Sequence, residues 1–124
     1  MNVCLVHNFR FEAAHRLPRL PADHKCRRLH GHGYRIEVEI RGPIDPQMGW
    51  FMDFSDIRRA TDPVRDRLDH QVLNEIDGLD NPTAELLSVW IWQQLDATLP
   101  GLYRVTVHET CACRCDYLGP GNAG

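Results

Sequence analysis

The sequence predicts one α+β domain in which an antiparallel sheet carries two helices. Near both ends of the chain, apolar residues alternate with polar ones at a period of two, which is typical of half-buried strands. Between these segments, two stretches place apolar residues at helical spacing. Helices that are grouped between runs of strands favour separate layers over alternating βαβ units, so we expect an antiparallel sheet.

Length and composition fit one small globular domain. The chain has 124 residues, 43% of them hydrophobic, without a repeat or a Gly/Ser linker, so we expect residues 1–124 to form one domain around one core. The net charge of -3 lacks the basic excess typical of nucleic-acid binding. The apolar run over residues 3–6 is too short for a signal peptide or a membrane span. We therefore expect a cytoplasmic protein that binds neither nucleic acid nor membrane and that oligomerises to complete its burial.

Strands are predicted in the first third of the sequence. Residues 34–41 alternate strictly between apolar and charged side chains, which predicts a half-buried strand. Residues 3–13 alternate less cleanly, because His7 interrupts an otherwise apolar odd-numbered face, but they still predict a first strand. After a loop over 42–49 that contains two prolines, the apolar run 50–52 predicts a short third strand.

The first helix is predicted to begin near Ser55. Apolar and small side chains recur from there at helical spacing as far as Leu68. Asp53 or Ser55 can cap the first turn, because each side chain carries an oxygen that accepts from a free backbone N–H. Pro63 lies inside this stretch and has no backbone N–H to donate, so we expect a kink or an interruption there.

The second helix and the closing strand follow. Asn81 is the predicted cap, with Pro82 at the first helical position, and the pair Pro100–Gly101 is predicted to end the helix. Residues 102–110 then alternate again and predict a closing strand, with room for one more strand after it.

Three histidines lie where the strand pattern predicts that they share one face. His30 and His32 continue the even-numbered apolar face of the 34–41 strand, and His15 continues the odd-numbered face of the 3–13 strand. If the two strands pair, the three imidazoles point to one buried side, where an unpaired polar ring is costly. A zinc ion on three imidazoles would leave a fourth position open, as in catalytic sites. The alternative is three ordinary polar histidines near the end of a sheet.

A thiol and several cations precede the histidine pair. Cys26 lies four residues before His30, and its cationic neighbours favour the thiolate, which can serve as a base or a nucleophile. A small buried residue is the alternative. The cations of this segment could bind phosphates or could simply be solvated: Arg16, Lys25, Arg27 and Arg28.

Two carboxylates are further candidates. Asp69 precedes His70 at the end of the first predicted helix, and it can orient that imidazole in a proton relay only if the chain has already left the helix. A pair on the surface is the alternative. Glu109 shares the odd-numbered apolar face of the last strand, so it forms either a structural ion pair or an anchor for a ligand with adjacent N–H donors, such as a pterin or guanine.

The five cysteines are an odd set, and a reducing compartment argues against disulfides. Cys111, Cys113 and Cys115 alternate along the chain but lack the two separated pairs typical of thiolate zinc sites. We interpret them as reduced structural thiols, and a second metal site is the alternative.

Taken together, five motifs in order resemble the 6-pyruvoyl/6-carboxy-tetrahydropterin synthase family. They are residues 11–17 (FEAAHRL), Cys26 with His30-Gly31-His32, Leu68-Asp69-His70, residues 81–85 (NPTAE), and Glu109-Thr110. Three residues separate Cys26 from His30. This short gap resembles the 6-carboxy-5,6,7,8-tetrahydropterin synthase branch, whereas the pyruvoyl enzymes carry a longer insertion.

The resemblance implies a tunnelling fold (T-fold), in which an antiparallel sheet has two helices on one face. Sheets of three subunits would close a β-barrel, and two trimers would stack into a homohexamer with active sites between subunits. It also implies a zinc-dependent lyase of queuosine biosynthesis that converts 7,8-dihydroneopterin triphosphate to 6-carboxy-5,6,7,8-tetrahydropterin. A pyruvoyl-type synthase that retains the side chain and a non-catalytic zinc- or purine-binding module are the alternatives.

The resemblance assigns a role to each candidate residue. Zinc would bind His15, His30 and His32, and Cys26 would be the general base. Asp69 and His70 would relay protons. The pterin ring would be held by three residues: Glu109, Thr83 and Glu85.

Overall fold

Five strands and two α-helices make up the structure, a computed structural model that describes residues 1–121; the last three residues of the predicted domain lie outside this range. The strands are β1 (Asn2–His15), β2 (His30–Pro43), β3 (Gln71–Val72), β4 (Leu102–His108) and β5 (Arg114–Tyr117). The helices are α1 (Phe54–Leu68) and α2 (Ala84–Leu95), and the short 3-10 helices are η1 (Lys25–Arg27) and η2 (Leu73–Glu75). The strands form one sheet in the order β3-β1-β2-β4-β5.

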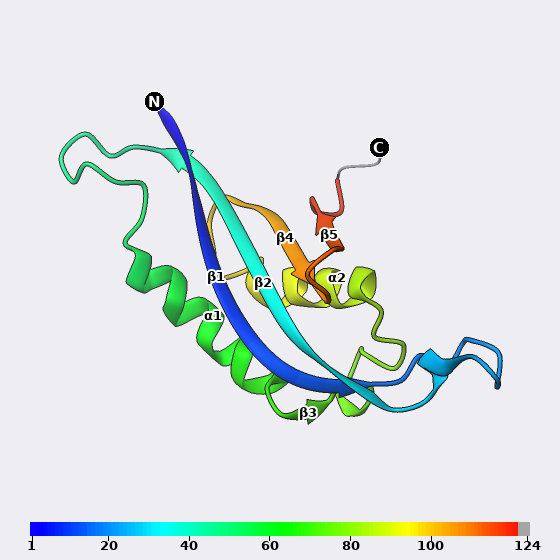
Figure 1. Cartoon of the computed structure of the whole chain (residues 1–124). Helices are drawn as coiled ribbons and strands as arrows, with labels where there is room; N and C mark the ends of the chain where they lie inside the picture. The colour runs from blue at the N-terminus through cyan, green and yellow to red at the C-terminus, as the bar shows by residue number, and fades with distance from the viewer. Residues whose placement is uncertain (122–124) are drawn as a thin grey trace.

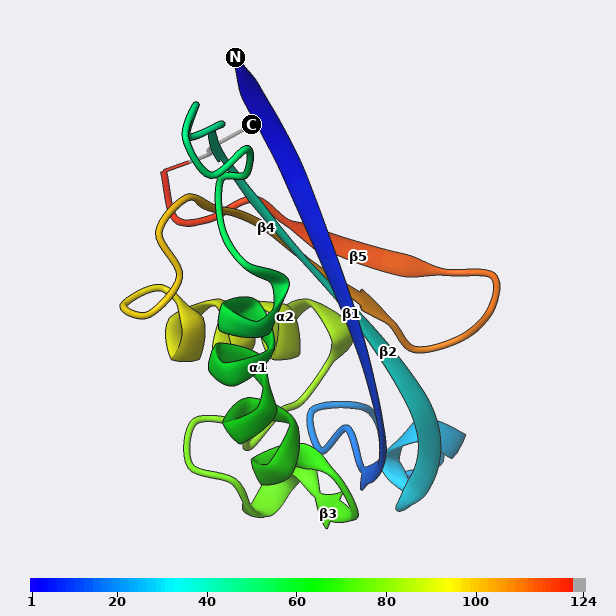
Figure 2. The same cartoon turned by 90° about the vertical axis from the view of Figure 1, so that its left-hand side faces the viewer.

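Both α-helices cover the same face of the sheet (Figures 1 and 2). The pairs β1–β2, β2–β4 and β4–β5 are antiparallel, and the two-residue β3 adds to β1 in parallel. The inward-facing side chains of β1, β2 and β4 pack with both helices into one core. The predicted α+β class, with an antiparallel sheet and two helices on one face, is therefore confirmed. Within residues 1–121, no helix is long and apolar enough to cross a membrane.

The register between β1 and β2 confirms the predicted parity. His15 lies opposite His30, and Ala13 lies opposite His32. Because directly opposed residues of an antiparallel pair point to the same face, all three histidine side chains lie on the helix-covered face. The strand predicted over 34–41 is longer than expected, since β2 already begins at His30.

The short strand predicted over 50–52 is wrong. These residues form bends in the loop that leads to α1. The Phe51 ring packs closely against Gly42, where an added Cβ would lie only 2.1 Å from a ring carbon. The apolar pattern therefore reflects side-chain packing against β2 and not a further strand.

Helix α1 begins where the predicted cap places it. Asp53 accepts a hydrogen bond from the backbone N–H of Ser55 at 2.9 Å. The helix continues through Pro63 as one element, so the predicted interruption does not occur. Pro63 and Arg59 are both exposed, so water can hydrate the Arg59 carbonyl that the proline leaves without an N–H donor.

Helix α2 begins later and ends earlier than predicted. Thr83, and not Asn81, is the cap, and its hydroxyl accepts from the N–H of Leu86 at 3.1 Å. Pro82 therefore precedes the helix, and its carbonyl is free to accept a bond from β1. The helix ends at Leu95, whose carbonyl accepts two turn bonds from Thr98 and Leu99, so the predicted end at Pro100–Gly101 is wrong.

Candidate active site

Three imidazoles come together at the end of the β1–β2 hairpin. One ring nitrogen from each of His15, His30 and His32 lies within 4.8 Å of the other two. The Nε2 atoms of His15 and His30 are 3.1 Å apart. His15 is buried and the other two rings are half-buried. Within residues 1–121, this is the group of side chains that the structure arranges as a possible metal centre.

Backbone carbonyls fix the tautomers of two of these rings. The Nδ1 atom of His15 donates to the carbonyl of Pro82 at 2.8 Å, and that of His30 donates to the carbonyl of Arg28 at 2.7 Å. A carbonyl only accepts, so both Nδ1 atoms carry the hydrogen and both Nε2 atoms carry a lone pair. Burial lowers the pKa of His15, which favours the neutral ring.

The donor set fits a zinc ion. Two facing Nε2 lone pairs at 3.1 Å cannot bond to each other, whereas a cation between them would satisfy both. Neutral imidazole is a preferred zinc ligand, and three such ligands leave one position open. The Nδ1–carbonyl bonds of His15 and His30 are the outer contacts that orient metal-binding histidines.

A thiol and a carboxylate share the cavity that the three histidines line. This cavity of about 510 Å³ is also lined by Lys25, Cys26 and Glu109. Cys26 lies on η1, and its N–H donates to the His24 ring at 3.1 Å. Glu109 Oε1 lies 3.2 Å from His15 Nε2. The predicted base and the predicted anchor are thus both beside the candidate metal centre.

Glu109 also lines a second cavity, of about 350 Å³, at the start of α2. Glu85 and Cys115 are among its other lining residues. This cavity has the two carboxylates that were predicted to hold a ring with N–H donors. Thr83 uses its hydroxyl to cap α2.

Asp69 and His70 form the predicted carboxylate–imidazole pair. The stated condition, that the chain has left the helix at this point, is met. Asp69 is the residue after α1 and has extended backbone angles. Its Oδ1 lies 3.0 Å from His70 Nδ1 and accepts from the N–H of Glu12 at 2.9 Å. The hydrogen bond from Glu12 lowers the pKa of Asp69. His70 has a φ of 60°, the one positive value for a non-glycine residue within 1–121.

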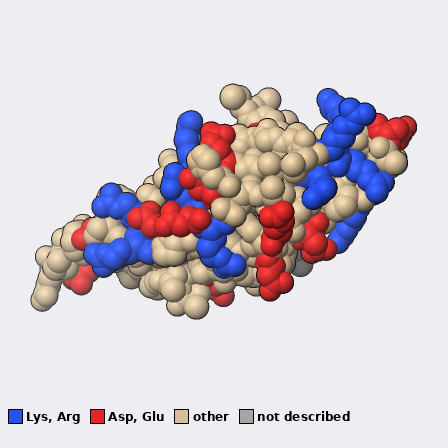
Figure 3. Space-filling view, turned by 90° about the horizontal axis from the view of Figure 1, so that it is seen from below, with Lys and Arg blue, Asp and Glu red and all other residues tan. Residues whose placement is uncertain are grey.

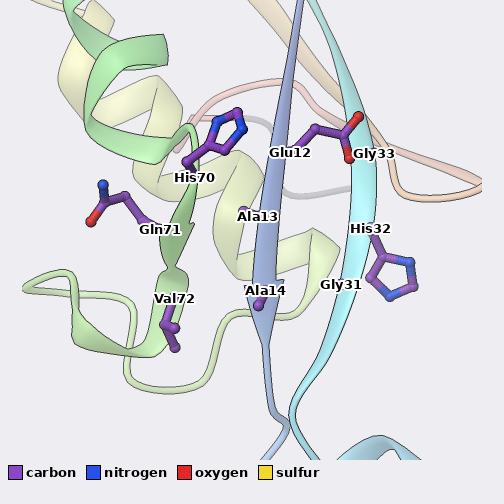
Figure 4. A pocket seen from close by; sticks show the side chains of 9 residues that line it. All are labelled: Glu12, Ala13, Ala14, Gly31, His32, Gly33, His70, Gln71 and Val72. Carbon is purple, nitrogen blue, oxygen red and sulfur yellow. The ribbon is translucent and has the colours of Figure 1, made fainter.

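This pair does not reach the thiol within one chain. His70 lines another cavity, of about 420 Å³, which it shares with His32 but not with Cys26 or Glu109. Figure 4 shows His70 on the β3 side of the hairpin and His32 on β2, with β1 between the two residues. The structure therefore places the three histidines, Cys26 and Glu109 around one cavity, and Asp69 and His70 are not among the residues that line it.

The loop between β1 and β2 carries the predicted cations. Figure 3 shows Lys and Arg side chains gathered at this protruding end of the molecule, where five of them are exposed: Arg16, Arg19, Lys25, Arg27 and Arg28. Lys25 is the only one of the four predicted cations that lines the cavity of the histidines. The Arg27 guanidinium instead donates to the Leu20 carbonyl at 3.3 Å.

All five cysteines are free thiols. Cys111 and Cys113 are exposed, whereas Cys115 is half-buried and lies 3.8 Å from the Ser88 hydroxyl. Within residues 1–121 these thiols form no metal-binding group. The alternative of a second metal site is therefore not supported.

Two groups of the site were not predicted as functional. The Tyr34 hydroxyl lies 3.2 Å from His15 Nδ1, and the strict alternation that identified Tyr34 as a core residue also placed it on the histidine face. The Pro82 carbonyl holds the same ring. A main-chain carbonyl leaves no signal in the sequence.

The fold and the site define a class: a T-fold protein whose central hairpin carries a three-histidine candidate metal centre beside a thiol and a carboxylate. Comparison with known proteins identifies the family. The sequence profile of 6-pyruvoyl tetrahydropterin synthase matches residues 4–120, and the chain belongs to this family.

Relatives within the family carry different names. The chain is 42% identical over 118 residues to 6-carboxy-5,6,7,8-tetrahydropterin synthase of Synechocystis sp., with 90% of each chain covered. It is 35% identical over 101 residues to dihydroneopterin monophosphate aldolase of Pyrococcus furiosus, with 82% of each covered. The solved structure of Caenorhabditis elegans 6-pyruvoyl tetrahydropterin synthase superimposes with a TM-score of 0.90 at 27% identity and covers 97% of each chain. This likeness confirms the predicted fold.

Proposed function

We propose that the protein is a zinc-dependent lyase that converts 7,8-dihydroneopterin triphosphate and one water molecule to 6-carboxy-5,6,7,8-tetrahydropterin, acetaldehyde and triphosphate. The observation that carries this proposal is the single cavity lined by three imidazoles, a thiol and a carboxylate. Two facts favour this branch of the family. One is the three-residue gap between Cys26 and His30, and the other is the 42% identity to a relative of that name.

Each residue around the cavity has a role that follows from its position. Glu109 accepts hydrogen bonds from the N–H groups of the pterin edge and so fixes the ring. Cys26 then faces the side chain of the substrate and accepts its carbon-bound proton as the general base. Zinc on the three histidines would supply a Lewis acid toward the side-chain hydroxyl groups.

The proton relay is proposed to come from a second copy of the chain. Within one chain, Cys26 and His70 line different cavities. A homohexamer with sites between subunits, as the family resemblance implies, would place Asp69 and His70 of one copy beside Cys26 of the next. Asp69 would then hold the tautomer of His70, as their 3.0 Å contact already does within the chain.

Product analysis of the zinc-loaded protein tests the reaction. Incubation with 7,8-dihydroneopterin triphosphate should yield acetaldehyde and 6-carboxy-5,6,7,8-tetrahydropterin in equal amounts. Cys26→Ala should lower turnover by roughly a hundredfold or more and leave the zinc content unchanged. Cys4→Ala, which removes an exposed thiol of β1, is the matched control and should behave as the wild type.

Other products would identify the other candidates. A pyruvoyl-tetrahydropterin product without acetaldehyde would replace the proposed reaction by triphosphate elimination with the side chain retained. Selective cleavage of dihydroneopterin monophosphate would favour an aldolase, the activity named for the relative in Pyrococcus furiosus. Unchanged activity in Cys26→Ala, or zinc binding without any turnover, would favour a non-catalytic module.

A further inference from the structure

Tyr34 is buried beside the candidate metal centre. Only 1% of it is exposed, and its ring stacks on Phe11 with the centroids 4.9 Å apart. Its hydroxyl lies 3.2 Å from His15 Nδ1. The same side chain lines a cavity of about 400 Å³ together with Glu109. Tyr34 is therefore within the site, although the reaction proposed above gives it no role.

The hydroxyl hydrogen of Tyr34 has no acceptor on His15. The Nδ1 atom of His15 already donates its hydrogen to the Pro82 carbonyl at 2.8 Å. The Tyr34 oxygen can therefore accept from this nitrogen but cannot donate to it. Within residues 1–121 the structure gives the hydroxyl no other partner. A buried donor without an acceptor is unfavourable, so the hydrogen requires an acceptor in the adjoining cavity.

Glu109 is the acceptor that the surroundings offer. Its carboxylate lines the same cavity as Tyr34, and its Oε1 lies 3.2 Å from His15 Nε2 and 3.5 Å from His32 Nε2. A bond from a neutral donor to a carboxylate is among the stronger hydrogen bonds. It would orient the carboxylate toward the pterin edge without adding charge.

We propose that Tyr34 is a positioning residue for ligand binding: its oxygen accepts from His15, and its hydroxyl hydrogen is donated to Glu109. One side chain thus aligns the metal ligand and the ring anchor. The inference deepens the proposed function, because it assumes that Glu109 binds the pterin.

Neopterin binding to the zinc-loaded protein tests this role. Tyr34→Phe keeps the ring that stacks on Phe11 and should weaken neopterin affinity about tenfold, while one equivalent of zinc and the thermal midpoint stay as in the wild type. In a Glu109→Ala background, which has no side-chain acceptor, Tyr34→Phe should have no further effect. Tyr117→Phe removes a hydroxyl elsewhere on the sheet and should leave neopterin affinity unchanged. Additive effects of the Tyr34 and Glu109 substitutions would overturn the proposal.

A crystal structure of the zinc-loaded protein separates this proposal from the proposed function. The Tyr34 hydroxyl should lie within hydrogen-bond distance of a Glu109 carboxylate oxygen. A hydroxyl that donates to water instead would overturn the positioning role, even if acetaldehyde is produced. A Tyr34–Glu109 bond in a protein that releases no acetaldehyde would retain the positioning role and reject the reaction.

Discussion

Two backbone carbonyls decide the chemical state of the candidate metal centre. Pro82 and Arg28 each accept the Nδ1 hydrogen of one histidine, which leaves both Nε2 atoms as lone-pair donors at 3.1 Å. Side chains alone would not set this state, since a neutral imidazole has two tautomers. The turn before α2 and the segment before β2 are therefore part of the site, although neither supplies a ligand atom.

Removal of one histidine ligand tests the candidate metal centre. His30→Ala should reduce bound zinc from about one equivalent per chain to nearly none, because two imidazoles do not hold zinc as three do. Metal analysis after dialysis measures this. His7→Ala removes a histidine that faces α1 and should leave the zinc content intact. Full zinc content in His30→Ala would exclude the triad.

The sequence was sufficient to predict those site residues whose positions follow from strand parity. His15, His30 and His32 share one face because a period of two fixes side-chain direction, and Glu109 follows the same rule. Cys26 lies in a loop, where no periodicity applies; its cationic neighbours left a base, a nucleophile or a buried residue open, and the family resemblance selected the base. The Tyr34 hydroxyl bond depends on a tautomer set by a distant carbonyl, which no local pattern encodes.

At the scale of elements, a hydrogen bond between Glu37 and His108 links β2 and β4 on the helix-free face. Glu37 of β2 accepts from His108, the last residue of β4, with Arg35 and Arg104 nearby. His108 immediately precedes Glu109. The pair therefore stabilises the end of the strand from which the anchor projects.

This pair makes stability depend on pH. The hydrogen bond from His108 lowers the pKa of Glu37 below its ordinary value of 4.5. The resulting stabilisation is fully present above the pKa that Glu37 has in the unfolded chain. It is lost as the pH falls through the lower pKa that Glu37 has in the folded protein. In denaturant unfolding, Glu37→Gln should cost stability at pH 6, and the difference from the wild type should shrink below pH 4.5. The exposed Glu75→Gln serves as the control, and a difference that grows in acid would contradict the assignment.

Element boundaries were predicted least well, for identifiable reasons. An apolar run such as 50–52 cannot distinguish a strand from side chains that fill a gap beside a glycine. Asn81 and Thr83 are both good caps, and the choice between them depends on the His15–Pro82 bond. Long periodic elements were predicted correctly because many residues agree with one period.

At the scale of the whole molecule, the sheet ends in two edges. Among residues 1–121, β3 pairs with Ala13 and Ala14 alone and leaves most of that side of β1 without a neighbouring strand, and β5 forms the other edge. Open edges favour association. Closure into a barrel with two further copies, as the family resemblance implies, would pair both edges, and we propose this assembly.

Mixed assemblies test whether the active site lies between copies. Cys26→Ala and His70→Ala should each be inactive alone. When the two variants are unfolded together and refolded, roughly a quarter of the sites should combine an intact Cys26 with an intact His70 of a neighbour, if assembly is random. Recovery of about that share of wild-type turnover is expected. No recovery in mixed assemblies of the wild-type size would indicate that both residues act within one chain.

The left-handed backbone at His70 carries a conformational cost, which the proposed proton relay would set against thermal stability. A side chain with a Cβ adopts a φ of 60° at a cost of roughly 1 kcal/mol, whereas glycine adopts it freely. Directed evolution under thermal selection alone would therefore enrich His70→Gly and discard the imidazole of the relay. The proposed proton relay would account for a histidine at this position despite its backbone cost, so a thermostabilised version of this protein has to be assayed for turnover whenever residue 70 has changed.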